Sequence, residues 1–240
     1  MKPSYFDQRA HRVRFDWGWR GAQEVAARGD VVVIVDVLRF STMVASATSR
    51  GIGIVPVSDA DDVETVQREH NAVVIEGALA PLRYETIPSG TRVIVRSPNG
   101  ATCVRMSKDA PEVVIGAIVN APAIGVHLRE ALSRKQKVTI IACGERWADS
   151  SEDGALRFAL EDYLGAGAIL CQIDEDLSPE AQVCAAAFRA QRHQILQLLL
   201  TCGSGLELLA RNDQASVELA ASLGRYEVVP ILKNGIILPL

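Results

Sequence analysis

The feature that most constrains the fold is a regular alternation of short apolar runs with helical segments over the first 150 residues. Residues 31–37 form an apolar run that only Asp36 interrupts, typical of a strand buried on both faces, and residues 41–50 are predicted to form a helix that stops at Gly51. Further strands are predicted over 53–57, 72–75, 92–96, 112–119 and 137–143, with helices over 59–70, 101–108 and from Asn120 or Pro122 to about 134. This rhythm predicts crossover units and a mainly parallel sheet with helices on both faces.

The second half of the chain changes character. Helices are predicted over residues 152–171 and 178–202, the latter with Ser178 and Pro179 as cap and first helical residue, and one or two more over 204–223. Asn234-Gly235 between two apolar runs signals a terminal hairpin. We therefore predict a three-layer α/β/α fold with a mainly parallel, mixed sheet, a C-terminal helical region and a β-hairpin. The simplest organisation is one domain over residues 1–240, and a division near residue 150 is the alternative.

Charge and cysteine content narrow the class of protein. With 25 Lys+Arg against 29 Asp+Glu the net charge is −4, which argues against a nucleic-acid partner held by a basic face. The five cysteines form no Cys-x-x-Cys pair, which indicates free thiols in a reducing compartment. No signal peptide and no apolar stretch of membrane-spanning length is visible. We expect a cytoplasmic protein without a membrane partner, and a homodimer is left open.

Polar residues follow four of the predicted strands. In open α/β sheets, ligands bind outside the carboxyl ends of the strands. If the strands are parallel, these groups converge on one rim and form a site. They are Asp36, Arg39, Ser41 and Thr42 after the first strand, Ser97, Asn99, Gly100 and Thr102 after the fourth, Asn120 after the fifth, and Cys143 and Glu145 after the sixth.

The richest of these clusters begins at Asp36. A carboxylate at a strand end can hold Mg²⁺ together with phosphate and water. Arg39 offers a planar fork that matches phosphate or sulfonate oxygens, and the helix that starts near Ser41 and Thr42 offers free N–H groups to an anion. The alternative is structural: Asp36 caps the helix and Arg39 pairs with a surface acid.

The later clusters also allow two interpretations each. The turn over residues 97–102 can present backbone donors to an anion, or it is an ordinary Pro-Asn-Gly turn. Asn120 can orient substrate or water, or it caps the helix that Pro122 begins. Cys143 is expected to be a core thiol in preference to a nucleophile.

Three further acids remain ambiguous. Glu145 suits a metal ligand or a general base, or it is a solvated loop acid. Glu161 and Asp162 lie within a predicted helix, where they reach a metal or simply face solvent. The sequence contains no P-loop, no dinucleotide fingerprint and no Gly-x-Ser-x-Gly elbow.

Several of these motifs together resemble a known family. From about residue 30 to the C-terminus the chain is similar to the 2-phosphosulfolactate phosphatases, the ComB family. The resemblance rests on the order and spacing of short motifs. These are Asp36-Val37-Leu38-Arg39-Phe40-Ser41-Thr42, Asn99-Gly100 with Thr102, Val119-Asn120-Ala121, Glu161-Asp162 before Ala166-Gly167, Ser204-Gly205-Leu206-Glu207-Leu208, Asp213, and Val228-Val229-Pro230-Ile231-Leu232.

The resemblance implies a fold and an activity. The family fold is a three-layer α/β/α arrangement, and its members are Mg²⁺-dependent phosphatases. Their named reaction hydrolyses 2-phosphosulfolactate to 3-sulfolactate and phosphate, a step of coenzyme M biosynthesis. The chain departs from the family after the third strand, where only Glu76 and Gly77 can stand in for a Gly-Glu-Arg segment, and in a longer loop over residues 144–149. The chain therefore resembles a divergent member of the family, for which a related phosphorylated hydroxy acid is also a candidate substrate.

These residues suggest a mechanism. Asp36, with Glu145 or Glu76, is expected to hold Mg²⁺, and Asn120 to orient water or substrate. The expected substrate-binding residues are Arg39, Ser41, Thr42, Ser97, Asn99, Gly100, Thr102 and Cys143. Two alternatives stay open. One is a catalytically silent anion- or metabolite-binding protein that kept the fold, and the other is a helical interaction module over residues 178–202.

Overall fold

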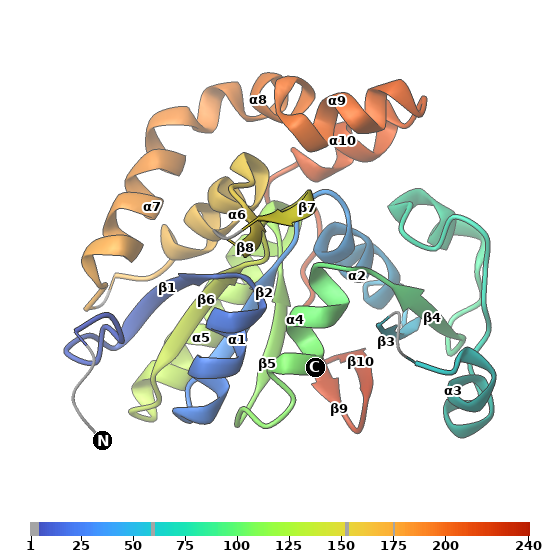
Figure 1. The fold of residues 1–240 in the computed structure, drawn as a ribbon, viewed down its shortest axis with the longest axis horizontal. Coiled ribbons are helices and arrows are strands. Elements are labelled where there is room, and N and C mark those ends of the chain that lie inside the picture. Colours follow the sequence, from blue (N-terminus) through green and yellow to red (C-terminus); the bar gives the residue numbers. More distant parts are fainter. Residues whose placement is uncertain (1–4, 59–60, 152–153, 175) are drawn as a thin grey trace.

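A single mixed sheet organises the molecule. The computed structural model describes residues 5–58, 61–151, 154–174 and 176–240. Over these residues eight strands form one sheet in the order β1-β6-β2-β5-β9-β10-β3-β4, with helices on both faces (Figure 1). The predicted three-layer α/β fold with a mainly parallel, mixed sheet is confirmed.

Four strands form the parallel half of the sheet. They are β1 (Val13–Trp17), β6 (Val138–Ala142), β2 (Val31–Val35) and β5 (Val113–Gly116), each parallel to its neighbour. Every residue of β2 and β6 is buried, as expected for strands that are covered on both faces. The carboxyl ends of β2 and β6 therefore lie side by side at one rim.

The C-terminal hairpin sets the direction of the other half. β9 (Pro230–Lys233) and β10 (Ile236–Pro239) insert between β5 and β3 (Gly53–Val57), and β4 (Arg92–Arg96) forms the edge. The pairings β5/β9, β9/β10 and β10/β3 are all antiparallel. Because these three successive pairings are antiparallel, β3 and β4 run in the direction opposite to β2. The hairpin prediction is confirmed, with Asn234 and Gly235 at φ 51° and 79° in the turn.

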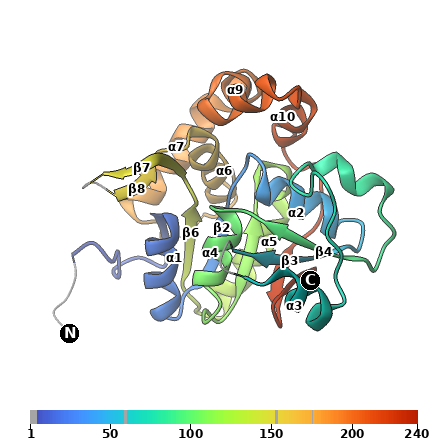
Figure 2. The ribbon, with the colours of Figure 1, turned by 45° about the vertical axis from the view of Figure 1, so that its right-hand side comes forward.

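Two apolar cores lie on the two faces of the sheet (Figures 1 and 2). Successive residues of β2 belong to different cores, because strand side chains alternate between faces. One core includes side chains of α1 (Gly18–Ala27), α2 (Phe40–Thr48) and α4 (Gly100–Met106). The other includes side chains of α5 (Ala121–Ser133), α6 (Leu160–Leu170) and α7 (Pro179–Gln191).

Two further units stand at the rim where β2 and β6 end. The first is a two-stranded hairpin of β7 (Glu145–Ser151) and β8 (Gly154–Arg157), which follows β6 directly. The second is the run of short helices α8 (Ile195–Thr201), α9 (Gly203–Ala210) and α10 (Gln214–Ala220). Figure 1 shows these C-terminal helices crossing the top of the molecule above the sheet.

Two predicted helices differ from the structure. The helix expected over 152–171 begins only at Leu160, because the β7–β8 hairpin takes the preceding residues, and Glu152 lies outside the described residues. The helix expected over 178–202 is broken at the short turn Arg192–Gln194 between α7 and α8. Ser178 caps α7 as predicted, since its hydroxyl accepts from the N–H of Ala181 at 3.2 Å.

Segments around β3 and β4 also depart from the prediction. The strand expected over 72–75 is reduced to one bridge between Val73 and Val93. The helix expected from residue 59 is α3 (Val63–His70), capped by Asp62, and Asp59 lies outside the described residues. A 3₁₀ segment, η1 (Pro81–Thr86), then leads back toward β4.

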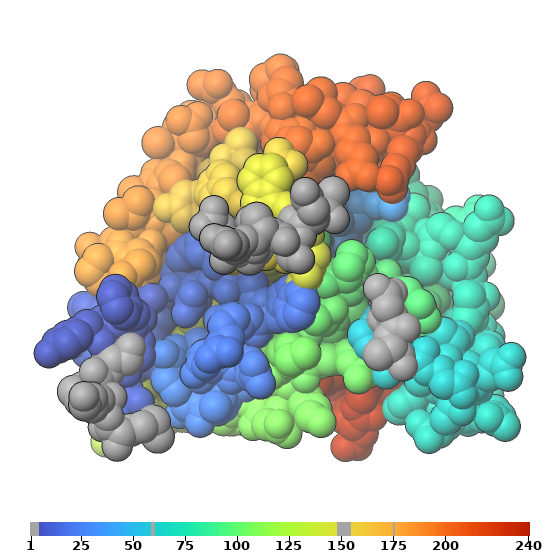
Figure 3. Space-filling view, viewed as in Figure 1, coloured from blue at the N-terminus to red at the C-terminus, as the bar shows by residue number. Residues whose placement is uncertain are grey.

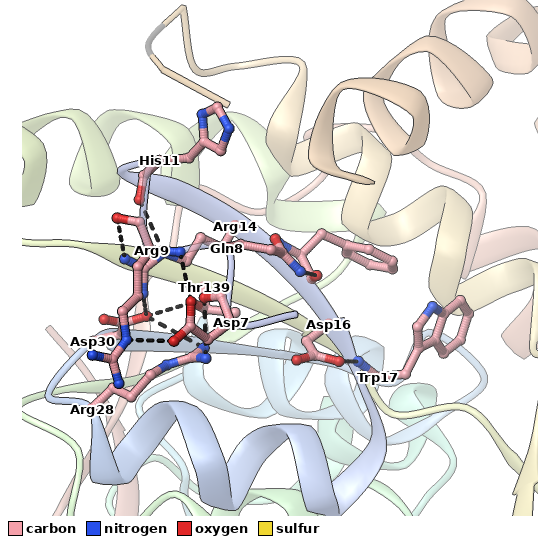
Figure 4. Close-up of polar contacts among 11 residues, drawn as sticks. Asp7, Gln8, Arg9, His11, Arg14, Asp16, Trp17, Arg28, Asp30 and Thr139 are labelled. Carbon is pink, nitrogen blue, oxygen red and sulfur yellow. Dashed lines mark hydrogen bonds and ion pairs between the residues drawn. The ribbon is translucent and has the colours of Figure 1, made fainter. Parts of the chain in front are cut away.

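The sequence did not indicate β1, because a charged residue interrupts its apolar pattern. Arg14 is buried within the strand, and its Nη1 donates to Asp30 Oδ2 at 2.9 Å (Figure 4). The hydroxyl of Thr139 donates to the same oxygen at 2.7 Å. A buried charge is tolerated where it is paired and hydrogen-bonded. This polar cluster lies at the amino ends of β2 and β6, away from the rim described above.

Two further predictions concern membrane-spanning helices and the state of the cysteines. Within them, no helix is long and apolar enough to cross a membrane. All five cysteines are free thiols, as predicted, and Cys171 is the only one that is not buried.

Candidate active site

Asp36 lies between the first turns of two helices. Its Oδ1 accepts from the N–H of Phe40 at 3.2 Å, and its Oδ2 accepts from the N–H of Gly100 at 2.9 Å. Phe40 and Gly100 are the first residues of α2 and α4. The Ser97 hydroxyl lies 3.4 Å from the same Oδ2. One carboxylate thus joins the turn after β2 to the turn after β4, and it is only 6% exposed.

Gly100 is required by the closeness of these turns. A Cβ at this position would lie 2.3 Å from Phe40 Cδ1 and 2.7 Å from Asp36 Oδ2. No side chain fits there without displacing one of the two turns. Because the N–H of Gly100 already donates to Asp36, it is not free to bind a phosphate as predicted.

The predicted convergence of strand ends holds only in part. Asp36 and Glu145 follow β2 and β6, which are parallel neighbours, so their meeting has the predicted cause. The same explanation is wrong for Ser97 and Asn99, because β4 runs opposite to β2. Their turn reaches Asp36 because the chain after β4 returns over the sheet into α4, which packs against α1, β3 and β2 (Figure 2).

Four carboxylates gather at this rim. Glu145 is the first residue of β7, and Glu161 and Asp162 lie in the first turn of α6. The Ser204 hydroxyl, from α9, lies 3.2 Å from Glu145 Oε1 and also hydrogen-bonds to Glu161 Oε1. We call Asp36, Glu145, Glu161 and Asp162 the carboxylate cluster.

Two further contacts fix members of the cluster. Asn99 Nδ2 donates to Glu145 Oε2 at 3.1 Å, so this residue lies at the cluster, and its contact with substrate stays a prediction. The Asp162 carboxylate accepts from the N–H groups of Val37 and Gly144 at 2.7 and 2.9 Å. The loops after β2 and β6 are therefore both attached to the start of α6.

The electrostatics of the carboxylate cluster are unfavourable for full ionisation. Burial and the nearby charge of Glu145 raise the pKa of Asp36 to about 7. Burial and the charge of Asp36 raise the pKa of Asp162 well above its usual range. Burial and the charge of Glu161 raise the pKa of Glu145. The site thus concentrates negative charge that protons or a cation must compensate.

Arg39 lies beside this cluster and forms an ion pair with Asp213, the residue before α10. The hydroxyl of Ser216 donates to Asp213 Oδ1 at 2.6 Å and holds it in place. The structure therefore shows both contacts that a purely structural role of these residues would require. Asp36 caps helices, and Arg39 pairs with an acid. The carboxylate cluster is the feature that this alternative does not explain.

A hollow of about 290 Å³ adjoins Arg39. Arg96 and the segment that includes Ile75 and Gly77 also line it. In Figure 3 the blue atoms at the start of α2 are set back between the orange C-terminal helices and the turquoise segment around η1. Arg39 is thus both paired and open to a small ligand from this side.

Other predicted binding residues stabilise the local backbone instead. The Ser41 hydroxyl accepts from the N–H of Asp36 at 2.9 Å and donates to the carbonyl of Ile34 at 3.2 Å. The Thr42 hydroxyl donates to the carbonyl of Val37 at 2.7 Å. Thr102 lies 3.5 Å from the carbonyl of Ser97. These side chains order the two turns.

Asn120 is fully buried, and its side-chain amide forms hydrogen bonds with backbone groups. Its Oδ1 accepts from the N–H of Ala117 at 2.8 Å, and its Nδ2 donates to the carbonyls of Ile115 and Val228, both at 3.2 Å. It fastens the end of β5 to the segment before β9. The prediction that Asn120 orients substrate or water therefore gains no support, and its side chain makes no capping bond to α5 either.

Cys143 and Glu76 lie apart from the cluster. Cys143 is buried in the apolar core, where burial and the neighbouring Cys103 raise its pKa. It is therefore a protonated core thiol, as predicted from the sequence. Its predicted contribution to substrate binding is not supported. Glu76 is exposed on the segment between α3 and η1, next to residues that line the hollow beside Arg39.

Glu161 and Asp162 were left open from the sequence as metal ligands or surface acids, and neither they nor Ser204 were predicted as site residues. The signal was present in α6, where two adjacent acids begin an otherwise apolar helix, and both are nearly fully buried, at 2% and 3% exposure. In the described part of the chain, no group of three or more His, Cys, Asp or Glu side chains forms a ready-made metal site.

Comparison with known proteins identifies relatives of the whole chain. The sequence model of the 2-phosphosulpholactate phosphatase family matches residues 21–235. A probable 2-phosphosulfolactate phosphatase of Symbiobacterium thermophilum is 29% identical over 89% of this chain and 95% of its own length. Proteins of the same name from Carboxydothermus hydrogenoformans and Microcystis aeruginosa are 28% and 27% identical, over 85% and 87% of this chain and 87% and 91% of their own lengths.

The family model spans nearly all of the described fold, including the turn at Asp36, the carboxylate cluster and the C-terminal helices. The resemblance inferred from short motifs is thereby confirmed, and with it the prediction of a phosphoric monoester hydrolase. The chain belongs to the 2-phosphosulpholactate phosphatase family.

Proposed function

We propose that this chain is a Mg²⁺-dependent phosphatase that hydrolyses a small phosphorylated hydroxy acid, with 2-phosphosulfolactate as the first candidate. The observation that carries the proposal is the carboxylate cluster beside Arg39, where β2 and β6 end. The names of the relatives add the substrate. A silent binding protein would not need an acidic cluster in which neighbouring charges raise the pKa values of Asp36, Glu145 and Asp162.

The donor set fits a hard divalent cation. Mg²⁺ prefers oxygen ligands and is commonly held by one or two carboxylates together with water and substrate phosphate. Asp36 and Glu145 are the best placed of the predicted ligands, because the charge of Glu145 acts on Asp36, whereas Glu76 is exposed outside the cluster. When bound, Mg²⁺ would polarise the phosphoryl oxygens and lower the pKa of a bound water.

The chain's own residues supply the other parts of the reaction. The guanidinium of Arg39 has five N–H donors, so the ion pair with Asp213 leaves donors for a phosphate or sulfonate oxygen. Glu145 is only partly buried, whereas the other three acids of the cluster are buried, so Glu145 is the carboxylate that water can reach. We assign it the role of accepting a proton from water.

Ser204 and Asn99 act on Glu145 from two sides. The Asn99 amide donates to one carboxylate oxygen, and the Ser204 hydroxyl, whose single proton is shared with Glu161, lies 3.2 Å from the other. Ser204 comes from α9 and Asp213 precedes α10, so the C-terminal helices contribute to both sides of the site.

The test is phosphate release from a panel of phosphomonoesters, with Mg²⁺ or with EDTA. The panel contains 2-phosphosulfolactate, phospholactate and 2-phosphoglycerate, and the variants are Asp36→Asn, Glu145→Gln and Arg39→Met. We expect turnover only with Mg²⁺, the fastest rate with the sulfonate, and a loss of about 100-fold or more in Asp36→Asn and Glu145→Gln. Arg129→Met, on the surface of α5, is the matched control for Arg39→Met.

Three results would count against this function. Undiminished activity in Asp36→Asn removes the role of Asp36. Equal rates in EDTA remove the metal. Binding of the panel without turnover favours the silent anion-binding alternative.

A further inference from the structure

A second cavity, of about 500 Å³, lies between the start of α1 and the β7–β8 hairpin. Figure 2 shows the hairpin projecting above α1. Arg146 and Leu156, which are paired across the hairpin, line the cavity together with Trp17, Trp19 and Met106. Glu145 precedes Arg146 in β7, and adjacent strand residues face opposite sides. The cavity is therefore on the other side of β7 from the carboxylate cluster.

Arg146 is a cation with an unsatisfied donor. Its guanidinium carbon lies 3.5 Å from the centre of the Trp19 ring, so the group is stacked on the indole. Its Nε is buried and has no hydrogen-bond partner in the described chain. A buried N–H without an acceptor is costly and rare, so the guanidinium of Arg146 is held here by its stacking on Trp19 and not by protein acceptors at Nε.

The charges around the cavity favour an anion. Among the residues that the structure describes, no acidic side chain lines it, and the other lining arginine, Arg20, is exposed and paired with Glu24 at 2.9 Å. The first turn of α1, which forms one wall, contains no acid, and the Asp16 carboxylate just before it accepts from the N–H of Trp17 at 2.8 Å. The cation of the cavity is therefore Arg146.

The walls of the cavity are apolar. Trp19, Met106 and Leu156 are large apolar side chains that remain partly exposed, and they meet around the one stacked guanidinium. A cavity of this volume, mostly apolar with a few directed polar groups, is typical of a small-molecule site. A fully polar anion such as phosphate would leave these walls in contact with water.

We propose that this cavity binds a small amphiphilic anion, which consists of an aromatic or branched apolar body and one carboxylate or sulfonate. The acid group pairs with the Arg146 guanidinium, and the apolar body contacts Trp19, Met106 and Leu156. The site is separate from the proposed phosphatase centre and does not depend on it.

The test is calorimetric titration of the full chain with three probes: phenylbutyrate, its neutral counterpart phenylbutanol, and acetate. We expect phenylbutyrate to bind at one site per chain, at least about ten-fold more tightly than either of the others. Arg146→Met keeps an apolar stem and removes the charge, and should weaken phenylbutyrate binding about ten-fold. Arg20→Met, which removes the arginine already paired with Glu24, should change it by less than about two-fold.

Several outcomes overturn the proposal. They are the absence of phenylbutyrate binding, equal affinities for the acid and the alcohol, and unchanged binding in Arg146→Met. Displacement of phenylbutyrate by inorganic phosphate would place it in the carboxylate-cluster site instead. If Arg146→Met does not fold, as judged by its melting curve, Leu156→Asp places an acid at a partly exposed position of the same cavity and should abolish binding of the anion.

Discussion

The carboxylate of Asp36 accepts a hydrogen bond from the backbone N–H of Gly100 at 2.9 Å, although the two residues are 64 positions apart. The same carboxylate accepts from the first N–H of α2. A residue proposed to bind a metal therefore also positions two helices. Structure and function are combined in one side chain, and substitutions around it must be designed to separate the two.

Gly100→Ala tests the structural part alone. The added Cβ would lie within 2.3 Å of Phe40 Cδ1, so either the ring or the turn must move. We expect a loss of about 1–3 kcal/mol in the free energy of unfolding, measured by urea denaturation. Gly203→Ala is the control, because its nearest neighbouring atom is the end of Arg157 at 3.9 Å, and it should change stability by less than about 0.5 kcal/mol. Equal losses in both variants would refute the close-packing explanation.

Much of this fold could be predicted from the sequence, because its signals are local. The apolar run of β2 and the Asn-Gly turn of the terminal hairpin depend on neighbouring residues only, and both were predicted. The direction of β4 was not, because it follows from where the hairpin β9–β10 inserts into the sheet. β1 was missed because Arg14 looks polar in the sequence and becomes buried only through its pairing with Asp30.

The candidate site divides in the same way. Asp36 and Glu145 were found because they follow apolar strands, which the sequence reveals. Glu161, Asp162 and Ser204 belong to helices whose inward faces are fixed by packing against the sheet and against each other. Asn120 shows the opposite error, since a polar residue after a strand can be used entirely by the backbone.

Glu145→Gln tests whether the carboxylate cluster is under electrostatic strain without metal. Burial and the charge of Glu161 raise the pKa of Glu145, so the folded state holds a proton that the unfolded state has already released. Stability of the metal-free protein must then fall as pH rises from the unfolded pKa through the raised folded pKa. In EDTA, the melting temperature of Glu145→Gln relative to wild type should increase from about pH 5 to about pH 8.

Addition of Mg²⁺ gives the complementary result. A ligand that binds only the folded state raises the melting temperature, and Glu145→Gln should show a smaller rise than wild type. An equal rise in both proteins would exclude Glu145 as a ligand. If the difference in melting temperature between Glu145→Gln and wild type in EDTA does not depend on pH, the substitution relieves no charge repulsion.

Ser204→Ala tests the positioning of Glu145 from α9. The Ser204 hydroxyl hydrogen-bonds to the Glu145 carboxylate and lowers its pKa, in opposition to the effect of burial. Without it, the pKa of Glu145 should rise. We expect a lower kcat, and the acid limb of the pH–rate profile should move to higher pH.

The control for this variant is Ser222→Ala, in which an exposed hydroxyl that donates to the Glu218 carbonyl is lost. It should keep both the rate and the pH profile of wild type. A lower rate in Ser204→Ala without any shift of the acid limb would mean that the hydroxyl supports packing and does not act on Glu145.

Glu112 and His127 give a pH-dependent contribution to stability far from the site. His127 Nε2 lies 2.6 Å from Glu112 Oε1, and this hydrogen bond lowers the pKa of Glu112. A carboxylate with a lowered folded pKa stabilises the protein above its unfolded pKa, and the contribution is lost as pH falls through the folded pKa. Glu112→Gln should therefore lower the free energy of unfolding by less than about 1 kcal/mol near pH 6, and the difference from wild type should shrink toward pH 3. Urea unfolding at the two pH values measures this, and a difference that grows on acidification would show that the pair does not act through the ionised carboxylate.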